Sequence, residues 1–234
     1  MRARSTTTKT PLPSSALRVT RFARTLVAAA AALSLVAATA LAQTPADKPR
    51  VPPGVDPGGV AVAIIGDGID YTRPEIAARL ARDGEGQIFG WDFIDADRRP
   101  FATCAGGASS AQACPTNAAS TIVRLAPTVR LIVVRASPSR PQSLVEAMLL
   151  VRQSPARIVL VSFDTQQEMV THFLLDAANR FPDLLFYAAE ANIPRSDQSA
   201  VKPANLFVAE DPQELIARAV TAPPPPPVIG GKAR

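Results

Sequence analysis

The sequence predicts an α/β domain over residues 59–220, built in three layers with helices on both faces of a mainly parallel β-sheet. Two observations indicate this fold class. Short, continuous apolar runs recur along the chain, and a run that is apolar on both faces is typical of a strand buried between helices. Segments with helical spacing of apolar residues separate these runs, and alternation of strand and helix favours parallel pairing.

The apolar runs define the expected strands in order. They cover residues 60–65, 88–93, 130–134, 157–163, 184–189 and, with a weaker pattern, 206–209. Helical spacing predicts helices over residues 74–82, 142–152 and 166–180. The first of these begins with Pro74 and carries Glu75 in its first turn, which is a common way to start a helix.

The first 42 residues are predicted to be a secretory signal peptide. They carry basic residues and no acids, then an apolar run, and end in Ala40-Leu41-Ala42, a small-residue cleavage pattern. The alternative, a transmembrane anchor, needs about twenty apolar residues, and this stretch is slightly shorter. We therefore expect export to the periplasm or the medium, with no membrane span after cleavage.

Two further segments are predicted to lie outside the domain. Residues 43–58 are rich in Pro and Gly and are expected to form an extended leader. Residues 221–234 contain a run of prolines and are expected to form a polyproline tail, either a solvated spacer or a site for partner recognition.

The charge of the chain depends on the predicted signal peptide. The whole chain has a formal net charge of +5, but all six ionisable residues of the first 42 are basic, and the remainder has 19 Lys and Arg against 20 Asp and Glu. A basic excess would favour a nucleic-acid partner. Because the excess belongs to the targeting segment, we expect no nucleic-acid partner.

The two cysteines, Cys104 and Cys114, stand ten positions apart in a stretch rich in Gly, Ala and Ser. In an exported chain this spacing predicts a local disulfide. Two free thiols, or a cysteine nucleophile, are the alternatives. No cluster of zinc-ligand type is present, so no metal site is expected.

Residues 61–76, AVAIIGDGIDYTRPEI, have the pattern of a buried strand, a tight acidic turn and a helix. This segment is similar to the opening segment of the subtilisin-like serine proteases (subtilases), in which an apolar strand ends in Asp-Thr-Gly-Ile. Here the triplet is Gly66-Asp67-Gly68. The resemblance places Gly66 on the catalytic Asp of the family, and Asp67 stands one position too late.

Four later segments extend the resemblance in the same order. Residues 90–95 resemble a Gly-Trp-Asp-Phe strand, and residues 114–127 resemble the helix that carries the catalytic His, which falls on Cys114. Residues 158–164 are similar to the strand that ends at the peptide groove, implying Ser162, Phe163 and Asp164 as groove residues. Residues 185–192 are similar to the strand that ends at the oxyanion-hole Asn, implying Asn192. The nucleophile segment Gly-Thr-Ser-Met-Ala has no counterpart, so the resemblance implies a subtilisin-like domain truncated on its C-terminal side.

The resemblance therefore implies a pseudoprotease. Acyl transfer needs Ser, His and Asp in one geometry, and the sole histidine, His172, falls inside the predicted helix 166–180. The expected function is binding of a peptide or protein partner, with an extended chain held by strand addition in the implied groove.

The sequence leaves two alternative functions open. The first alternative is an active serine endopeptidase or other hydrolase whose site is unrecognised or completed by a partner. The second is a remnant with a structural role or none. No cofactor is expected, and the only indication of calcium is that Glu75 matches a calcium-binding acid of the family.

Overall fold

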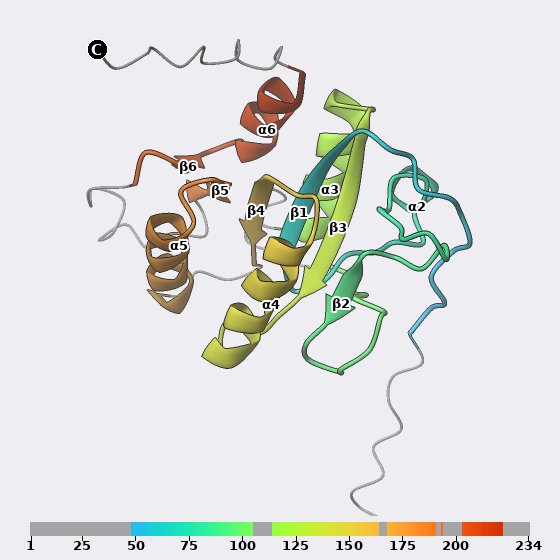
Figure 1. Cartoon of the computed structure of the whole chain (residues 1–234), viewed down its shortest axis with the longest axis horizontal. Helices are drawn as coiled ribbons and strands as arrows, with labels where there is room; N and C mark the ends of the chain where they lie inside the picture. The colour runs from blue at the N-terminus through green and yellow to red at the C-terminus, as the bar shows by residue number, and fades with distance from the viewer. Residues whose placement is uncertain (1–47, 105–113, 164–167, 191–192, 194–202, 222–234) are drawn as a thin grey trace, which may run out of the picture. The chain divides into compact units, whose positions relative to one another are not determined.

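The structure is a computed structural model that describes residues 48–104, 114–163, 168–190, 193 and 203–221 (Figure 1). The predicted signal peptide lies outside the described residues, as do Asp164, Asn192 and all but the first residue of the predicted tail. In the described part of the chain, no helix is both long enough and apolar enough to cross a membrane.

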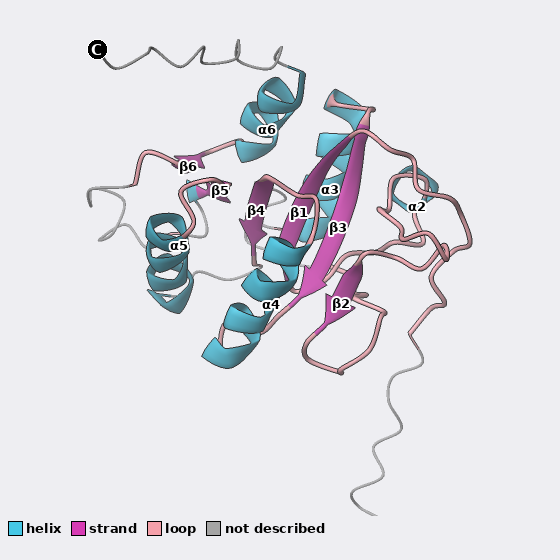
Figure 2. Cartoon of the chain, viewed as in Figure 1, coloured by secondary structure: helices cyan, strands magenta, loops and turns pink. Residues whose placement is uncertain are grey.

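Within the described residues, six parallel strands form one sheet in the order β2-β3-β1-β4-β5-β6 (Figure 2). The strands are β1 (Val60–Gly66), β2 (Gly90–Asp92), β3 (Val129–Arg135), β4 (Ile158–Ser162), β5 (Leu185–Ala189) and β6 (Leu206–Ala209). Each predicted strand is present, and the predicted α/β class with a parallel sheet is confirmed.

Helices cover both faces of the sheet, as predicted. They are α2 (Pro74–Ala77), α3 (Pro115–Leu125), α4 (Pro141–Gln153), α5 (Glu168–Arg180) and α6 (Pro212–Thr221). Alternate residues of β1 enter different cores, because Ile65 packs with α4 and α5 whereas Ile64 packs with α3 and α6. In Figure 1, α4 lies in front of the sheet and α3 lies behind it, and α5 belongs to the same core as α4.

The helix predicted over residues 74–82 is wrong in its length, since α2 ends at Ala77. Beyond it the backbone pairs with the sheet: Ala81 N donates to Leu131 O at 2.8 Å, and Leu131 N donates to Arg79 O at 2.7 Å. These hydrogen bonds to β3 replace the next helical turn, so tertiary pairing overrides the local helical pattern.

Helix α6 was not predicted from the sequence. Its start has a recognisable signature, because Pro212 occupies the first turn and Glu214 supplies an acid there. Ile216 and Ala217 are buried and pack on the same side of the sheet as α3. The helix therefore completes the layer behind the sheet.

Residues 48–58 contain no helix or strand and belong to the same compact unit as the sheet. Tyr71 Oη donates to Pro49 O at 2.8 Å, and Arg82 Nη2 donates to Pro52 O at 2.7 Å. At the far end of the segment, Asp56 forms an ion pair with Arg130 at 3.1 Å. This part of the expected leader is thus held along the domain by polar contacts that composition alone did not reveal.

Candidate functional site

The carboxyl ends of β1 and β4 form the place in this fold where a ligand site is most expected. Gly66 ends β1 and pairs with Ser162, which ends β4. From these two ends the chain continues toward opposite edges of the sheet, to β2 in one case and to β5 in the other. Open α/β sheets commonly bind ligands at such a switch point.

Position 66 has no room for a side chain. A Cβ atom built on Gly66 would lie 1.9 Å from the carbonyl oxygen of Ser162 and 3.1 Å from Pro115 Cγ. The obstructing oxygen belongs to the backbone of a central strand, so it cannot swing away as a side chain would. The position that the resemblance assigns to a catalytic Asp therefore cannot carry a carboxylate on this backbone.

The turn that follows is held in one conformation. Gly68 has a φ of 102°, a left-handed conformation that favours glycine. Arg135 Nε donates to Asp67 O at 2.9 Å. Asp67 and Gly68 line a cavity of about 110 Å³ together with Cys104, Cys114 and neighbouring residues. This is smaller than the roughly 300–1,000 Å³ of typical ligand pockets.

A cluster of ion pairs lies beside this turn, at the end of β2 and β3. Asp92 is fully buried, and its Oδ2 contacts Lys48 Nζ at 2.5 Å and Arg135 Nη1 at 2.8 Å. Its Oδ1 accepts hydrogen bonds from the backbone N–H groups of Ile94 and Asp95. Every oxygen of the buried carboxylate is therefore paired, which is what a buried charge needs in order to be tolerated.

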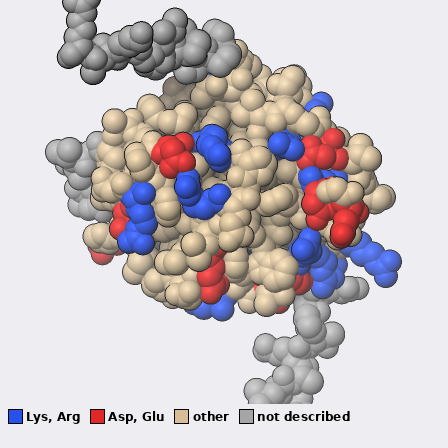
Figure 3. Space-filling model, viewed as in Figure 1, with Lys and Arg blue, Asp and Glu red and all other residues tan. Residues whose placement is uncertain are grey.

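The pKa values in the cluster follow from these contacts. The hydrogen bond from Lys48 is the largest influence on Asp95, and it lowers the pKa of that carboxyl despite partial burial. For Lys48 and Arg135, burial opposes the charged form, but hydrogen bonds to Asp92 and Asp95 outweigh it and raise both pKa values. The cluster therefore stabilises the charged forms of Lys48, Asp95 and Arg135. On the face shown in Figure 3, acidic and basic side chains likewise lie next to one another.

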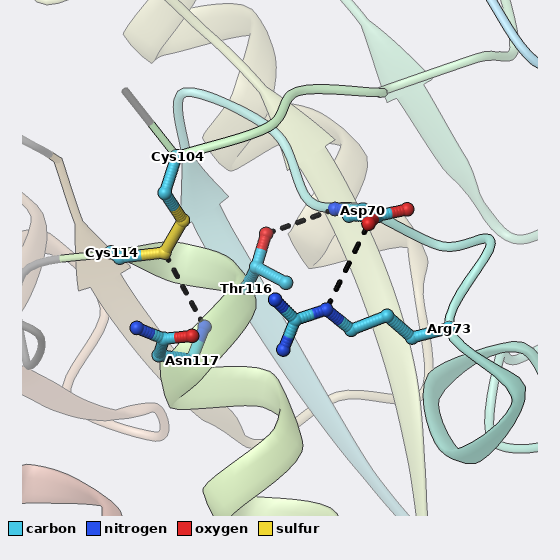
Figure 4. Close-up of a disulfide and its surroundings, with 6 residues drawn as sticks. All are labelled: Asp70, Arg73, Cys104, Cys114, Thr116 and Asn117. Atoms are coloured by element: carbon cyan, nitrogen blue, oxygen red, sulfur yellow. Dashed lines mark hydrogen bonds and ion pairs between the residues drawn. A yellow bond between two sulfur atoms is a disulfide. The ribbon is translucent and has the colours of Figure 1, made fainter. Parts of the chain in front are cut away.

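Cys104 and Cys114 are joined by a disulfide, with their Cα atoms 5.9 Å apart (Figure 4). The predicted bridge is confirmed, and the free-thiol and nucleophile interpretations are not. Cys114 is also the N-cap of α3, where its Sγ accepts a hydrogen bond from Asn117 N at 3.5 Å. Thr116 Oγ1 accepts from Asp70 N at 2.9 Å, which joins the start of α3 to the turn after β1.

The structure brings several of the implied site residues together at the carboxyl edge of the sheet. Gly66, Asp67 and Cys114 meet at the carboxyl edge. Ser162 and Phe163 also lie at this edge, but they are only 2% and 0% exposed, so their side chains do not form a surface for a peptide. The other two implied residues, Asp164 and Asn192, lie outside the described residues.

The only histidine is exposed on α5, in the layer in front of the sheet. Cys114 caps the N-terminus of α3, in the layer behind the sheet. The two residues thus stand on helices that cover opposite faces of the sheet. His172 is not positioned by the fold to serve the carboxyl edge.

The acid with the expected link to calcium has a protein partner. Ser120 Oγ donates a hydrogen bond to Glu75 Oε1 at 3.1 Å. Within the described ranges, no three or more His, Cys, Asp or Glu side chains are grouped so that they could hold a metal ion. Calcium binding stays a prediction from the resemblance.

A second concave site was missed by sequence reasoning. A groove of about 470 Å³ runs between α3 and the first turn of α6, and Asp211, Gln213 and Glu214 line one of its walls. The groove could not be predicted because α6 itself was not predicted. The Asp-Pro-Gln-Glu helix start at residues 211–214 was the signal that could have located this wall.

Comparison with known proteins finds a distant likeness to solved structures. No family model matches the chain, and no curated protein matches it. Among solved structures, it is similar to the crystal structure of a cold-adapted subtilisin-like serine proteinase, with 18% identity and a TM-score of 0.33. The likeness covers 60% of this chain and 49% of the proteinase, so the chain spans about half the length of that protein. The α/β class rests on the observed sheet and its packing.

Proposed function

We propose that this chain is an exported domain without peptidase activity that acts by binding a peptide or protein partner. The observation that carries the proposal is the lack of space at Gly66, where a Cβ atom would stand 1.9 Å from Ser162 O. A catalytic carboxylate orients the imidazole of a serine protease, and no carboxylate fits at this position. The geometry therefore favours a fold that no longer supports the chemistry of the family it resembles.

The second implied catalytic position is also committed to folding. Cys114 is tied to Cys104 and caps α3, so its sulfur is neither a nucleophile nor a proton acceptor for one. The imidazole of His172 is on the other face of the sheet. Loss of single members of such a triad lowers turnover by about 10⁴ to 10⁶. Both implied catalytic positions serve the fold. This supports loss of activity over an active enzyme in which one catalytic residue is displaced.

Export is supported by two independent features. The basic and apolar composition of residues 1–42 is that of a signal peptide, and a disulfide between Cys104 and Cys114 forms and persists in oxidising compartments. Binding is supported by the groove of about 470 Å³ between α3 and α6, which falls in the size range of ligand pockets.

Covalent labelling tests the loss of activity. The purified, oxidised chain beginning at Gln43 is incubated with a fluorophosphonate probe, beside an active subtilisin and a heat-denatured sample of the chain. We expect no labelling above the denatured sample and no hydrolysis of unfolded casein. Near-stoichiometric labelling of the folded chain at a serine, located by mass spectrometry, would overturn the proposal.

Calorimetry tests the binding role. Reduced and carboxymethylated lactalbumin, a permanently unfolded chain, is titrated into the protein at two temperatures. Burial of apolar surface gives a negative heat-capacity change, so the binding enthalpy changes with temperature and cannot be zero at both. We expect saturable heat at one temperature at least. Absence of heat at both temperatures counts against a role in binding unfolded chains.

A further inference from the structure

The groove between α3 and α6, called the α3–α6 groove from here on, joins two helices on one side of the sheet. Thr121 and Arg124 contribute to its wall on α3, and Gln213 and Glu214 of α6 form the other wall together with Asp211, which precedes the helix. Helix α6 has ten residues, and Ile216 and Ala217 anchor it to the core. The groove is therefore built between two fixed elements of the fold.

Gln213 is the most informative residue of the groove. It is only 4% exposed, yet its amide makes no hydrogen bond to any residue that the structure describes. The fully enclosed side-chain atoms without a partner, over the same described ranges, are Arg130 Nε and Thr171 Oγ1. The Gln213 amide is not enclosed in this way, so it opens into the groove that it lines. An amide with so little exposed surface can meet only the water in the groove, so a ligand that pairs with it loses little hydration.

Charges of opposite sign flank this amide. Arg124 is exposed on α3 and Asp211 is exposed immediately before α6, and neither forms an ion pair with a described residue. Glu214 differs, because it pairs with Arg218 at 3.7 Å along its own helix. The groove thus offers an unpaired cation on one wall, an unpaired carboxylate on the other, and a neutral amide below them.

This arrangement defines the chemistry of a ligand. A glutamine amide has an acceptor oxygen and a donor nitrogen, and a peptide group has one donor and one acceptor, so the two can exchange a pair of hydrogen bonds. Unpaired charges of both signs select a ligand that carries both, since a single-sign ligand meets one repulsive wall. A cavity of about 470 Å³ accommodates a short segment.

We propose that the α3–α6 groove binds a short peptide segment with one basic and one acidic side chain. Gln213 pairs with a peptide group of the ligand, Asp211 with its basic side chain, and Arg124 with its acidic side chain. This site deepens the binding role proposed above and rests on it, but places the peptide away from the carboxyl edge.

Titration of the ¹⁵N-labelled protein with blocked tripeptides tests the site. The probes are acetyl-Lys-Ala-Glu-amide, acetyl-Glu-Ala-Lys-amide and the uncharged acetyl-Gln-Ala-Gln-amide. We expect one of the charged probes to shift the backbone resonances of Thr121, Gln213 and Glu214. The uncharged probe should bind about three- to tenfold more weakly, because two exposed charge pairs are missing.

Gln213→Leu separates binding from folding. The substitution keeps the volume and removes the amide, so we expect binding of the charged probe to fall by about tenfold. The melting temperature should stay the same or rise, since an unpaired polar group has been removed. Gln142→Leu is the matched control, because Gln142 is an exposed glutamine on α4 that bonds to Glu146. It should bind as the wild type does.

Substitutions at two exposed residues test the binding site if Gln213→Leu does not fold. Asp211→Asn and Arg124→Gln should each weaken the charged probe and leave the uncharged probe unchanged. The inference is overturned if neither charged probe shifts the groove resonances at a probe concentration of about 10 mM, because the dissociation constant would then be too high for a binding site. It is also overturned if Gln213→Leu binds the charged probe like the wild type.

The results also distinguish this inference from the proposed function. Shifts centred on Gly66, Asp67 and Gly68 would overturn the groove and leave a binding role standing. Fluorophosphonate labelling would overturn the proposed function whatever the tripeptides do.

Discussion

Substitution of Gly66 by alanine is the most direct test of whether position 66 has room for a side chain. The added Cβ would lie 1.9 Å from Ser162 O, well inside the 3.0 Å below which Cβ atoms essentially do not approach. The oxygen belongs to β4, which is paired with β1 on one side and β5 on the other. Neither strand can move without disturbing the centre of the sheet.

The expected cost follows from this clash. Overpacking a core costs about 1–3 kcal/mol, and a backbone obstruction in a central strand belongs at the upper end. For a domain of this size each kcal/mol lowers the melting temperature by about 2–4 °C. We therefore expect Gly66→Ala to lower it by about 6–12 °C. Gly66→Asp, which introduces the acid that the resemblance implies at this position, should cost more, because it adds a charge beside a carbonyl oxygen.

Thermal unfolding followed by circular dichroism measures the effect. Gly84→Ala is the matched control, since Gly84 is exposed, has no atom within 4 Å of its added Cβ and does not need a left-handed backbone. It should melt within about 2 °C of the wild type. If Gly66→Ala melts like Gly84→Ala, position 66 has room for a side chain and the structural reason given for the proposed loss of activity is wrong.

Three further predictions concern the contacts that hold the domain. Lys48→Met removes one of two cations on the buried Asp92 and should lower the free energy of unfolding in urea by about 1–3 kcal/mol. Burial raises the pKa of Tyr71 to about 12. The free energy of unfolding should therefore be constant below the unfolded pKa of 10.0 and fall between about pH 10 and 12. In urea titrations over a series of pH values, Tyr71→Phe should show a smaller fall. Replacing Cys104 and Cys114 by serine should cost about 2–3 kcal/mol, measured as a lower melting temperature that reductant no longer changes.

Each of these predictions has an outcome that contradicts it. Arg180→Met removes an exposed ion pair with Asp176 and should lower the free energy of unfolding by less than about 0.5 kcal/mol. An equally small loss for Lys48→Met would mean that the buried cluster does not stabilise the fold. An alkaline decline as steep in Tyr71→Phe as in the wild type would assign that decline to other groups. A wild-type melting temperature that reductant leaves unchanged would mean that the disulfide stabilises nothing.

Local patterns predicted the strands well because each strand is encoded by its own residues. The continuous apolar run of β1 places five buried residues in a row, from Ala61 to Ile65, and such a run has few alternatives to a strand between two helical layers. The same reasoning failed at the end of α2, where hydrogen bonds from Ala81 and Arg79 to Leu131 of β3 decided the conformation. Those partners are about fifty positions away in the sequence, so no local window contains them.

The candidate sites show the same division. Resemblance placed Gly66 and Cys114 at one edge, and the disulfide followed from cysteine spacing in an exported chain. The obstruction at Gly66 depends on Ser162 O, and the burial of Phe163 depends on the α4–α5 layer. The unpaired amide of Gln213 depends on a helix that the pattern did not reveal.

The sequence by itself determined the α/β class, the six strands, the disulfide and the substitutions at the implied catalytic positions, because each depends on residue type and short-range spacing. Only the tertiary structure decided the strand order, the length of α2, the attachment of residues 48–58 and the α3–α6 groove. Lys48 and Asp92 meet across 44 positions of sequence. Contacts of this kind depend on how the whole chain packs, since the free energy of a charge or an amide is set by what surrounds it.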